Sequence, residues 1–293
     1  MRGSVVPLIL PKIIFVTLLG TVVAGAHYYY PAYFSDYTLA PFALLGAALS
    51  LFLGFRNNAC YDRWWEARKQ WGQLVVDSRS LSRQVISFID SKKPAGKELQ
   101  RRIVNLTIAY NHALKHRLRA TEPWEDLAAY IDSEELGRLR QLQNPPNAIL
   151  RMMGAKLGDC RHKDLMTDFL VQNLDDRITS IAGVQAACER IKNTPLPFAY
   201  MLLVQRTAYL YCLMLPFFLV TSQELLTPLF CAVVTYTFFG LDALSQELED
   251  PFGGTENDLP LDSLSKSIEI DLLETLGEDF IPEPLTPING RLE

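Results

Sequence analysis

The sequence predicts an all-α, multi-pass membrane protein that has four transmembrane helices and a large helical cytoplasmic region. Three observations predict this class. Of the 293 residues, 49% are hydrophobic while 21% are charged, a mixture that fits a membrane domain joined to a water-facing part. Several long runs contain no charged residue at all. No segment alternates apolar and polar residues in the manner of a β-strand.

Runs without charge locate the four membrane spans. A helix needs about 20 apolar residues to cross a bilayer. The third run extends toward the N-terminus through 195–205, where Arg206 interrupts it, and the fourth continues into 241–250. The uncharged runs themselves are 13–35, 37–55, 207–223 and 225–241.

The first span has two interpretations. Arg2 and Lys12 precede its apolar stretch and Ala24-Gly25-Ala26 ends it, which is the pattern of a cleaved secretory signal. The uncharged run, however, continues through the aromatic segment 27–34, which is typical of a membrane–water interface. We therefore expect a retained helix.

Basic residues predict the orientation in the membrane. The segment 56–192 contains 23 of the 28 Lys and Arg residues, whereas the connections 36–37 and 221–228 contain none. Cytoplasmic segments close to membrane spans are enriched in Lys and Arg. We therefore expect a protein of the inner cell membrane with both termini in the cytoplasm.

The second span is predicted to leave the membrane as one continuous helix. No proline lies between Phe55 and Phe88, and apolar residues recur there at helical spacing with Ser78 as the one exception. This stripe should pack on other helices, and its tryptophans are then packing residues. It consists of Cys60, Trp64, Ala67, Trp71, Leu74, Leu81, Val85 and Phe88.

Further helices are expected over 97–119, over 123–142 and, as one or two helices, over 147–192, with Pro145-Pro146 ending the second of these. From Asp242 onward, 14 acidic residues face only two basic ones. We expect a short amphipathic helix within 259–277, then an extended tail, and contact between this acidic part and the basic cytoplasmic region of its own or a neighbouring subunit.

The chain is thus predicted to have four segments. The first holds the first two spans, the second is cytoplasmic, the third holds the last two spans, and the fourth is an acidic cytoplasmic tail. Their predicted bounds are 1–55, 56–193, 194–250 and 251–293.

Composition and motifs argue against several functions. The net charge of −5 gives no signal for nucleic-acid binding. The sequence has no nucleophile–base pair, Gly-rich phosphate loop or metalloprotease motif, so we expect neither an enzyme nor a cofactor. His112 and His116 are four residues apart, but no third metal ligand is near, and we expect a solvated helix face. The cysteines have no paired spacing and should be reduced core residues: Cys60, Cys160, Cys188, Cys212 and Cys231.

Arg206 is unusual because it lies between apolar stretches. A charge inside a membrane span is costly and is generally paired or functional. We expect a buried acidic partner, such as Asp242 or an acidic residue in the extension of the second span. The alternative is a charge near the pore that attracts anions.

Three segments together resemble the bestrophin family of ion channels, specifically its bacterial branch. They are "LGFRNNACYDRWWEARKQWG" at 53–72, "TPLPFAYMLLVQRTAYLYCLMLPF" at 194–217 and "LDALSQELEDPFGGTENDLPLD" at 241–262, in the same order as in that family. The resemblance covers nearly the whole chain. It implies a homopentamer in the lipid bilayer, with four membrane helices per subunit and one central pore.

The resemblance also implies that the second span lines a narrow hydrophobic neck. The neck positions correspond to Ala47, Leu51 and Phe55, which lie four residues apart on one face of a helix. Apolar rings of this kind close a pore because an ion would lose hydration without compensation. Ala47 is smaller than its family counterparts, which leaves the other two as the barrier. Without the resemblance, packing against other helices is the alternative for this face.

Two further sites come from the resemblance. A second, cytoplasmic aperture corresponds to Phe169, with Leu165 as the fallback. Animal bestrophins bind calcium with an acidic cluster, whereas the matching stretch here has Glu256 and Asp258 as its only charges. Calcium takes six to eight oxygen ligands, several of them carboxylates. We expect at most a weak calcium site, no other metal, and opening that does not need calcium.

The sequence therefore predicts a passive channel for small monovalent ions. The net charge of −5 per chain favours cations weakly. The alternatives are a chloride or other anion channel of the same architecture, an ion-coupled transporter, or a scaffolding protein. Coupled transport usually needs acidic groups or broken helices at the midplane, and the first two spans have neither.

Overall fold

A computed structural model describes residues 3–34 and 38–287, and within these ranges it is all-α, without a strand. Contacts divide the chain into two compact units. The first unit comprises Met1–Trp65, Pro195–Pro251 and Thr255–Asn257. The second comprises Glu66–Thr194, Phe252–Gly254 and Asp258–Glu293. Arg2, the predicted turn at 36–37 and the end of the predicted tail lie outside the described residues.

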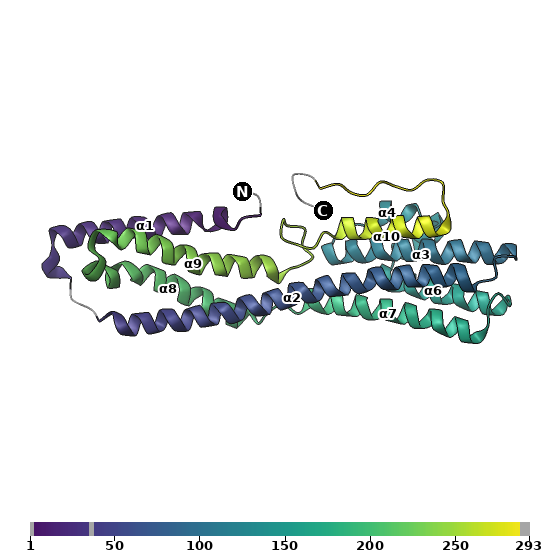
Figure 1. Cartoon of the computed structure of the whole chain (residues 1–293), viewed down its shortest axis with the longest axis horizontal. Coiled ribbons are helices and arrows are strands. Elements are labelled where there is room, and N and C mark those ends of the chain that lie inside the picture. Colours follow the sequence, from purple (N-terminus) through teal and green to yellow (C-terminus); the bar gives the residue numbers. More distant parts are fainter. Residues whose placement is uncertain (1–2, 35–37, 288–293) are drawn as a thin grey trace. The chain divides into compact units, whose positions relative to one another are not determined.

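The first unit is a bundle of apolar helices (Figure 1). Its helices α1, α8 and α9 pack on one another, together with the first part of α2. Helix α1 runs unbroken through Ala24-Gly25-Ala26. A 3-10 turn, η1 (Pro31–Tyr33), follows α1, and another, η2 (Glu224–Leu226), joins α8 to α9. The α-helices are α1 (Val6–Tyr29), α2 (Leu39–Phe88), α8 (Phe198–Gln223) and α9 (Thr227–Glu249).

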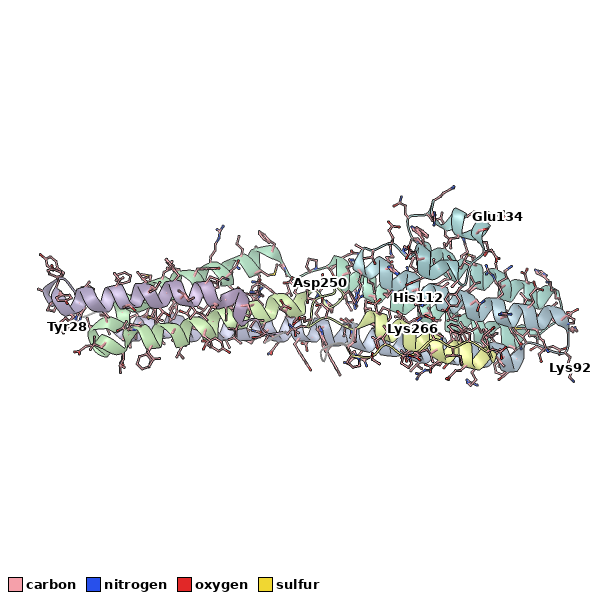
Figure 2. All side chains as sticks on the ribbon, turned by 90° about the horizontal axis from the view of Figure 1, so that it is seen from above. Tyr28, Lys92, His112, Glu134, Asp250 and Lys266 are labelled. Atoms are coloured by element: carbon pink, nitrogen blue, oxygen red, sulfur yellow. The ribbon has the colours of Figure 1, made fainter. Side chains whose placement is uncertain are left out.

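Three helical stretches in the described residues are long and apolar enough to cross a membrane, judged by length and composition. They are Val6–Tyr29, Leu39–Phe88 and Phe198–Glu249. The last of them contains both α8 and α9, which corresponds to the third and fourth predicted spans. In Figure 2, Tyr28 lies at one end of this bundle and Asp250 at the other.

Aromatic rings hold α2 against α8 in the first unit. The ring of Phe42 stacks on Tyr211 and on Phe218, each at 4.3 Å between centroids. Gly46 lies under the ring of Tyr211, where an added Cβ would come within 2.5 Å of the phenol oxygen. Only glycine permits this close approach, because any side chain at position 46 would displace the ring.

The second unit packs the remainder of α2 against α3 (Pro94–Arg119), α6 (Pro145–His162) and α7 (Asp168–Asn193). The prediction of one helix through Phe88 is confirmed. The predicted stripe is also confirmed, because most of its members are buried, including Trp71, Leu74 and Leu81. Ser78, its one polar member, is buried as well and accepts a hydrogen bond from Asn111 Nδ2 at 3.2 Å.

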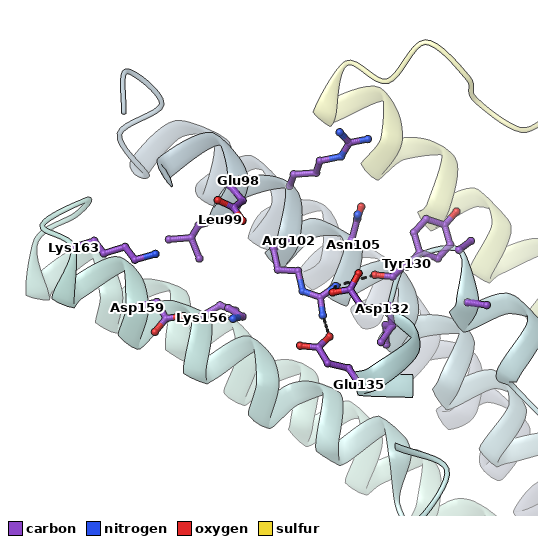
Figure 3. A pocket seen from close by; sticks show the side chains of 14 residues that line it. Glu98, Leu99, Arg102, Asn105, Tyr130, Asp132, Glu135, Lys156, Asp159 and Lys163 are labelled. Atoms are coloured by element: carbon purple, nitrogen blue, oxygen red, sulfur yellow. Dashed lines mark hydrogen bonds and ion pairs between the residues drawn. The ribbon is translucent and has the colours of Figure 1, made fainter. Parts of the chain in front are cut away.

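The helix predicted over 123–142 is wrong, because the structure has two short helices, α4 (Trp124–Ala128) and α5 (Ser133–Leu139). Arg102 on α3 explains the break (Figure 3). Its guanidinium donates to the carbonyl of Tyr130 at 3.1 Å and forms an ion pair with Glu135. The backbone must leave the helix to present that carbonyl. Arg102 also lines a polar cavity of about 440 Å³. Its positive charge is compensated there by the carboxylate of Glu135.

The proline pair has a different role from the one predicted. Pro145 and Pro146 occupy the first turn of α6, where a missing N–H costs nothing because the first amides of a helix have no intrahelical partner. Asn144 caps this helix by accepting from the amide of Asn147. The segment 147–192 consists of two helices, since α6 ends at His162 and α7 begins at Asp168.

The predicted amphipathic helix near the C-terminus is confirmed as α10 (Leu261–Leu276), which packs on α3. Ion pairs join acidic side chains of α10 and of the residues that follow it to basic residues of the second unit, as in Arg79–Asp271 and Arg101–Glu278. The acidic part of the chain therefore lies against the chain's own basic region. All five cysteines are free and buried, as predicted.

Candidate pore-lining face and the contacts behind it

One face of α2 is apolar and largely uncovered by the residues that the structure describes. Ala47, Leu51 and Phe55 are all exposed on this face, Leu51 by 57% and Phe55 by 56%. An α-helix advances by 3.6 residues per turn, so residues four apart share a face. The other helices of the same protomer therefore leave these side chains largely uncovered, and whether they line a pore or pack on further helices stays a prediction.

The opposite face of α2 is buried in the core of the first unit. Leu49, Leu53 and Cys60 are almost completely covered there. Both faces of the helix are apolar, so polarity alone does not distinguish them. Only one face is covered by α8 and α9, and the other is left for contacts that a single chain does not make.

A buried ion pair lies directly behind the exposed face. Arg56 follows Phe55 in the sequence and forms an ion pair with Asp242 of α9, with the two side chains only 2% and 1% exposed. The second carboxylate oxygen of Asp242 accepts a hydrogen bond from Gln246 at 2.9 Å. Taking two charges out of water is costly, so the pair fixes the position of α2 against α9 only because each charge is compensated.

Uncharged hydrogen bonds strengthen the same junction. Asn57 Nδ2 donates to the carbonyl of Leu241 on α9 at 3.2 Å. The hydroxyl of Tyr200 on α8 donates to the carbonyl of Phe52 at 3.1 Å. Less than two turns of α2 around Phe55, from Phe52 to Asn57, are therefore tied to neighbouring helices by three polar contacts. We refer to the side chains of Arg56, Asn57, Tyr200 and Asp242 as the clamp.

The expected partner of Arg206 is wrong. Asp242 pairs with Arg56 instead, because it lies on the side of α9 that faces α2. Arg206 is exposed on α8, and its side chain has no hydrogen bond or ion pair in the part of the chain that the structure describes. The sequence contained a signal for the true pair, since Arg56 and Asp242 are the first charges after two uncharged runs.

The two candidates for a second aperture lie in different environments. Phe169 is 72% exposed at the start of α7. Leu165 is 3% exposed in the core of the second unit, and its backbone carbonyl accepts from the amide of Asp90 at 3.0 Å. A buried side chain cannot line an open passage, so Phe169 is the member of the pair that stays a candidate.

The calcium candidates belong to different units. Glu256 lines a small polar pocket of about 180 Å³ in the first unit, together with Glu247 and Asn257. The amide of Asn257 donates to Glu247 at 3.1 Å and to the carbonyl of Gly3 at 3.3 Å, which occupies two of the oxygens near the pocket. Asp258, in the second unit, accepts from the amide of Gly254 at 2.5 Å.

The interpretation of His112 as part of a solvated helix face is wrong, because its side chain is buried and contacts carboxylates of α4 and α10. Figure 2 shows its place in the second unit. Its Nε2 lies 2.8 Å from the carboxylate of Glu269, and its Nδ1 lies 3.3 Å from Asp126. Lys115, three residues after His112 on α3, is also buried and forms ion pairs with Asp126 and Asp262. Alternating charges therefore join α3 to α4 and α10.

The strength of the ion pairs around His112 depends on pH. Burial opposes the charged form of His112, but hydrogen bonds to Asp126 and Glu269 outweigh it and raise the pKa. Burial likewise opposes ionisation of Glu269, yet its contacts with His112 and Lys266 lower its pKa to about 2. The histidine contribution is lost as pH rises through its raised pKa, and the carboxylate contribution is lost as pH falls below about 4. The contact between α10 and α3 is therefore strongest in mildly acidic to neutral solution.

Comparison with known proteins adds to this geometry. The chain matches the family described as Bacterial/Fungal Bestrophin protein over residues 1–274. It is 45% identical to the voltage-dependent anion channel-forming protein mll4386 of Mesorhizobium japonicum, over 95% of this chain and 88% of that protein. It is 46% identical to the voltage-dependent anion channel-forming protein YneE of Escherichia coli, over 86% of this chain and 81% of that protein.

Solved structures resemble this chain in fold as well. A crystal structure of a bacterial Bestrophin homolog from Klebsiella pneumoniae has a TM-score of 0.87 and 38% identity, covering 93% of this chain and 100% of that chain. The resemblance seen in the three quoted segments is thereby confirmed. The relatives' names describe channels and not enzymes, and they give no support to a preference for cations. The chain belongs to the bacterial and fungal bestrophin family and is a membrane-embedded ion channel protein.

Proposed function

We propose that this protein forms a homopentamer in the inner cell membrane and conducts small monovalent ions passively along a central axis. The observation that supports this most directly is the uncovered apolar face of α2 at Ala47, Leu51 and Phe55. Five such faces around an axis would form stacked apolar rings, which close a pore by excluding water. Four spans and a cytoplasmic location of both termini complete the proposed arrangement.

The clamp supports a fixed ring in preference to a mobile carrier helix. It ties α2 to α8 and α9 next to Phe55, and α2 is helical without interruption through this level. Ion-coupled transporters usually place broken helices at the midplane. An unbroken helix whose exposed face is uncharged from Ala47 to Phe55 therefore favours a passive pore over coupled transport.

The sign of the conducted ion has two candidates. The names of the relatives favour anions, and we take anion conduction as the first candidate. The second is cation conduction, which Asp62 favours. This exposed carboxylate lies seven residues after Phe55, on the same face of α2. Five carboxylates near one axis would attract cations.

The test is the reversal potential of the purified protein in a planar bilayer under a NaCl gradient. A shift toward the chloride equilibrium potential supports anion conduction, and a shift toward sodium supports cation conduction. In the second case, Asp62→Asn should reduce the shift. Absence of any current from confirmed pentamers would overturn the proposed function.

A matched pair of variants tests the gate. Leu51→Ala removes bulk from the proposed ring and should increase ion flux severalfold, because a wider ring is wetted more easily. Leu210→Ala is the control, since Leu210 on α8 is 56% exposed against 57% for Leu51. Equal flux in the two variants, with both folded as pentamers, would place the barrier elsewhere.

A further inference from the structure

An apolar groove lies on the surface of the first unit where α1, α8 and α9 meet. Its volume is about 310 Å³, and nearly all of its lining is apolar. Helix α1 provides one wall, α8 the other and α9 the floor. The apolar lining residues are Pro11, Phe15, Val16, Tyr209, Leu213 and Phe239, and no carboxylate is among them.

Lys12 lies in this groove without a negative partner. Its ammonium is 5.1 Å from the ring centre of Tyr209 and 4.9 Å from that of Phe239. Its side chain is half-buried and has no hydrogen bond or ion pair in the part of the chain that the structure describes. Two aromatic faces attract the cation but leave its charge uncompensated, so the site can still accept an anion.

Arg206 provides a second uncompensated cation beside the groove. It lies three residues before Tyr209 on α8, so both residues are on the same face of that helix. Arg206 and Lys12 also occupy equivalent depths. Lys12 lies 17 residues before the end of α1 at Tyr29, and Arg206 lies 17 residues before the end of α8 at Gln223.

That depth corresponds to the polar edge of a bilayer. Seventeen residues of helix measure about 26 Å, and the hydrocarbon core is about 30 Å thick. The far end of α1 is marked by the exposed aromatic residues Tyr28, Tyr29 and Tyr30, which are typical of the opposite interface. Long basic side chains at this level extend toward the phosphate groups of lipids.

We propose that the groove binds an anionic phospholipid. One acyl chain lies along Phe15 and Leu213, and the phosphate lies between Lys12 and Arg206. A second copy of this chain is a poor occupant, because the charges within α1 and α8 are these same two cations and would repel each other. A lipid phosphate supplies the missing negative charge, and its acyl chain supplies apolar contact.

The experiment measures lipid binding to the purified full-length assembly by native mass spectrometry. Phosphatidylglycerol and phosphatidylcholine with identical acyl chains are titrated in the same detergent. We expect preferential binding of phosphatidylglycerol. Lys12→Met or Arg206→Met should weaken it about fivefold, and the double variant about 30-fold, at about 1 kcal/mol per basic residue. Lys12→Arg should retain binding, and Lys92→Met, an exposed lysine of the second unit, should not change it.

A separate variant tests the proposed contact between the groove and the acyl chain. Leu213→Trp fills the groove while both cations remain, and it should weaken binding of phosphatidylglycerol without affecting soluble glycerol phosphate. Equal binding of the two lipids, or wild-type affinity in the folded double variant, would overturn the proposal. Binding of glycerol phosphate as tight as that of the lipid would also overturn it. No current is measured, so these outcomes are independent of whether the channel proposal holds.

Discussion

Neutralising Arg56 should destabilise the protein more than any surface charge does. Its side chain is 2% exposed and its partner Asp242 is 1% exposed, so neither charge is hydrated. In Arg56→Met, the carboxylate of Asp242 would keep a single hydrogen bond, from Gln246. An uncompensated charge would then remain in an apolar core.

The magnitude follows from this burial. Removing one partner of a buried ion pair costs about 3–5 kcal/mol, whereas replacing both partners by apolar residues of similar volume is often neutral or stabilising. Arg56→Met and Asp242→Leu should therefore each cost about 3–5 kcal/mol. The double variant should recover most of that loss. At about 2–4 °C per kcal/mol, each single substitution should lower Tm by on the order of 10 °C.

The assay is thermal unfolding of the purified protein in detergent, with pentamer size as a second readout. Arg138→Met is the control, because the Arg138–Glu134 pair is 73% and 78% exposed and should contribute less than about 1 kcal/mol. The argument fails if Arg56→Met unfolds at the same temperature as the control. It also fails if the double variant is less stable than both single variants, because the charges would then not be the cause.

Three further predictions concern protonation, thiols and calcium. Hydrogen-exchange protection of α10 amides should fall as pH rises through the raised pKa of His112, and His112→Gln should remove this dependence; unchanged dependence in that variant would exclude the histidine. The Cys188 thiol, whose pKa is raised to about 12 by burial and by nearby Glu189, should not react with alkylating reagents at neutral pH until the protein is denatured, as mass spectrometry would show. Chelation of calcium should leave ion flux unchanged, and a loss of current would require the carboxylate of Glu256 to be re-examined.

Local patterns predicted the regular parts of the fold because packing acts along one helix at a time. The stripe from Cys60 to Val85 repeats at helical spacing, and its burial followed from that spacing alone. The break in the helix predicted over 123–142 could not be predicted from such spacing. It depends on the guanidinium of Arg102, which belongs to another helix and attracts a carbonyl at Tyr130. Contacts of this kind leave no periodic trace in the sequence.

The candidate pore-lining face, too, could be predicted only in part from the sequence. Ala47, Leu51 and Phe55 could be placed on one face from their spacing, but the spacing does not say which face is covered. The partner of Arg56 lies 186 residues away, and charge alone gave Asp242 two possible arginines. Geometry decided between them, because α9 presents Asp242 toward α2 and Arg206 lies on the outer side of α8.

The exposed face of α2 and its buried face have different physical requirements. A ring that closes a pore by excluding water must stay apolar and uncovered within its own protomer, so packing cannot hold it in place. Its position must be set from the opposite side of the helix. The clamp meets this requirement, since Arg56, Asn57 and the carbonyl of Phe52 make polar contacts with α8 and α9 while Phe55 itself stays exposed. Substitutions at Leu51 should therefore alter conduction with little effect on stability, whereas substitutions at Arg56 should alter stability first and conduction as a consequence.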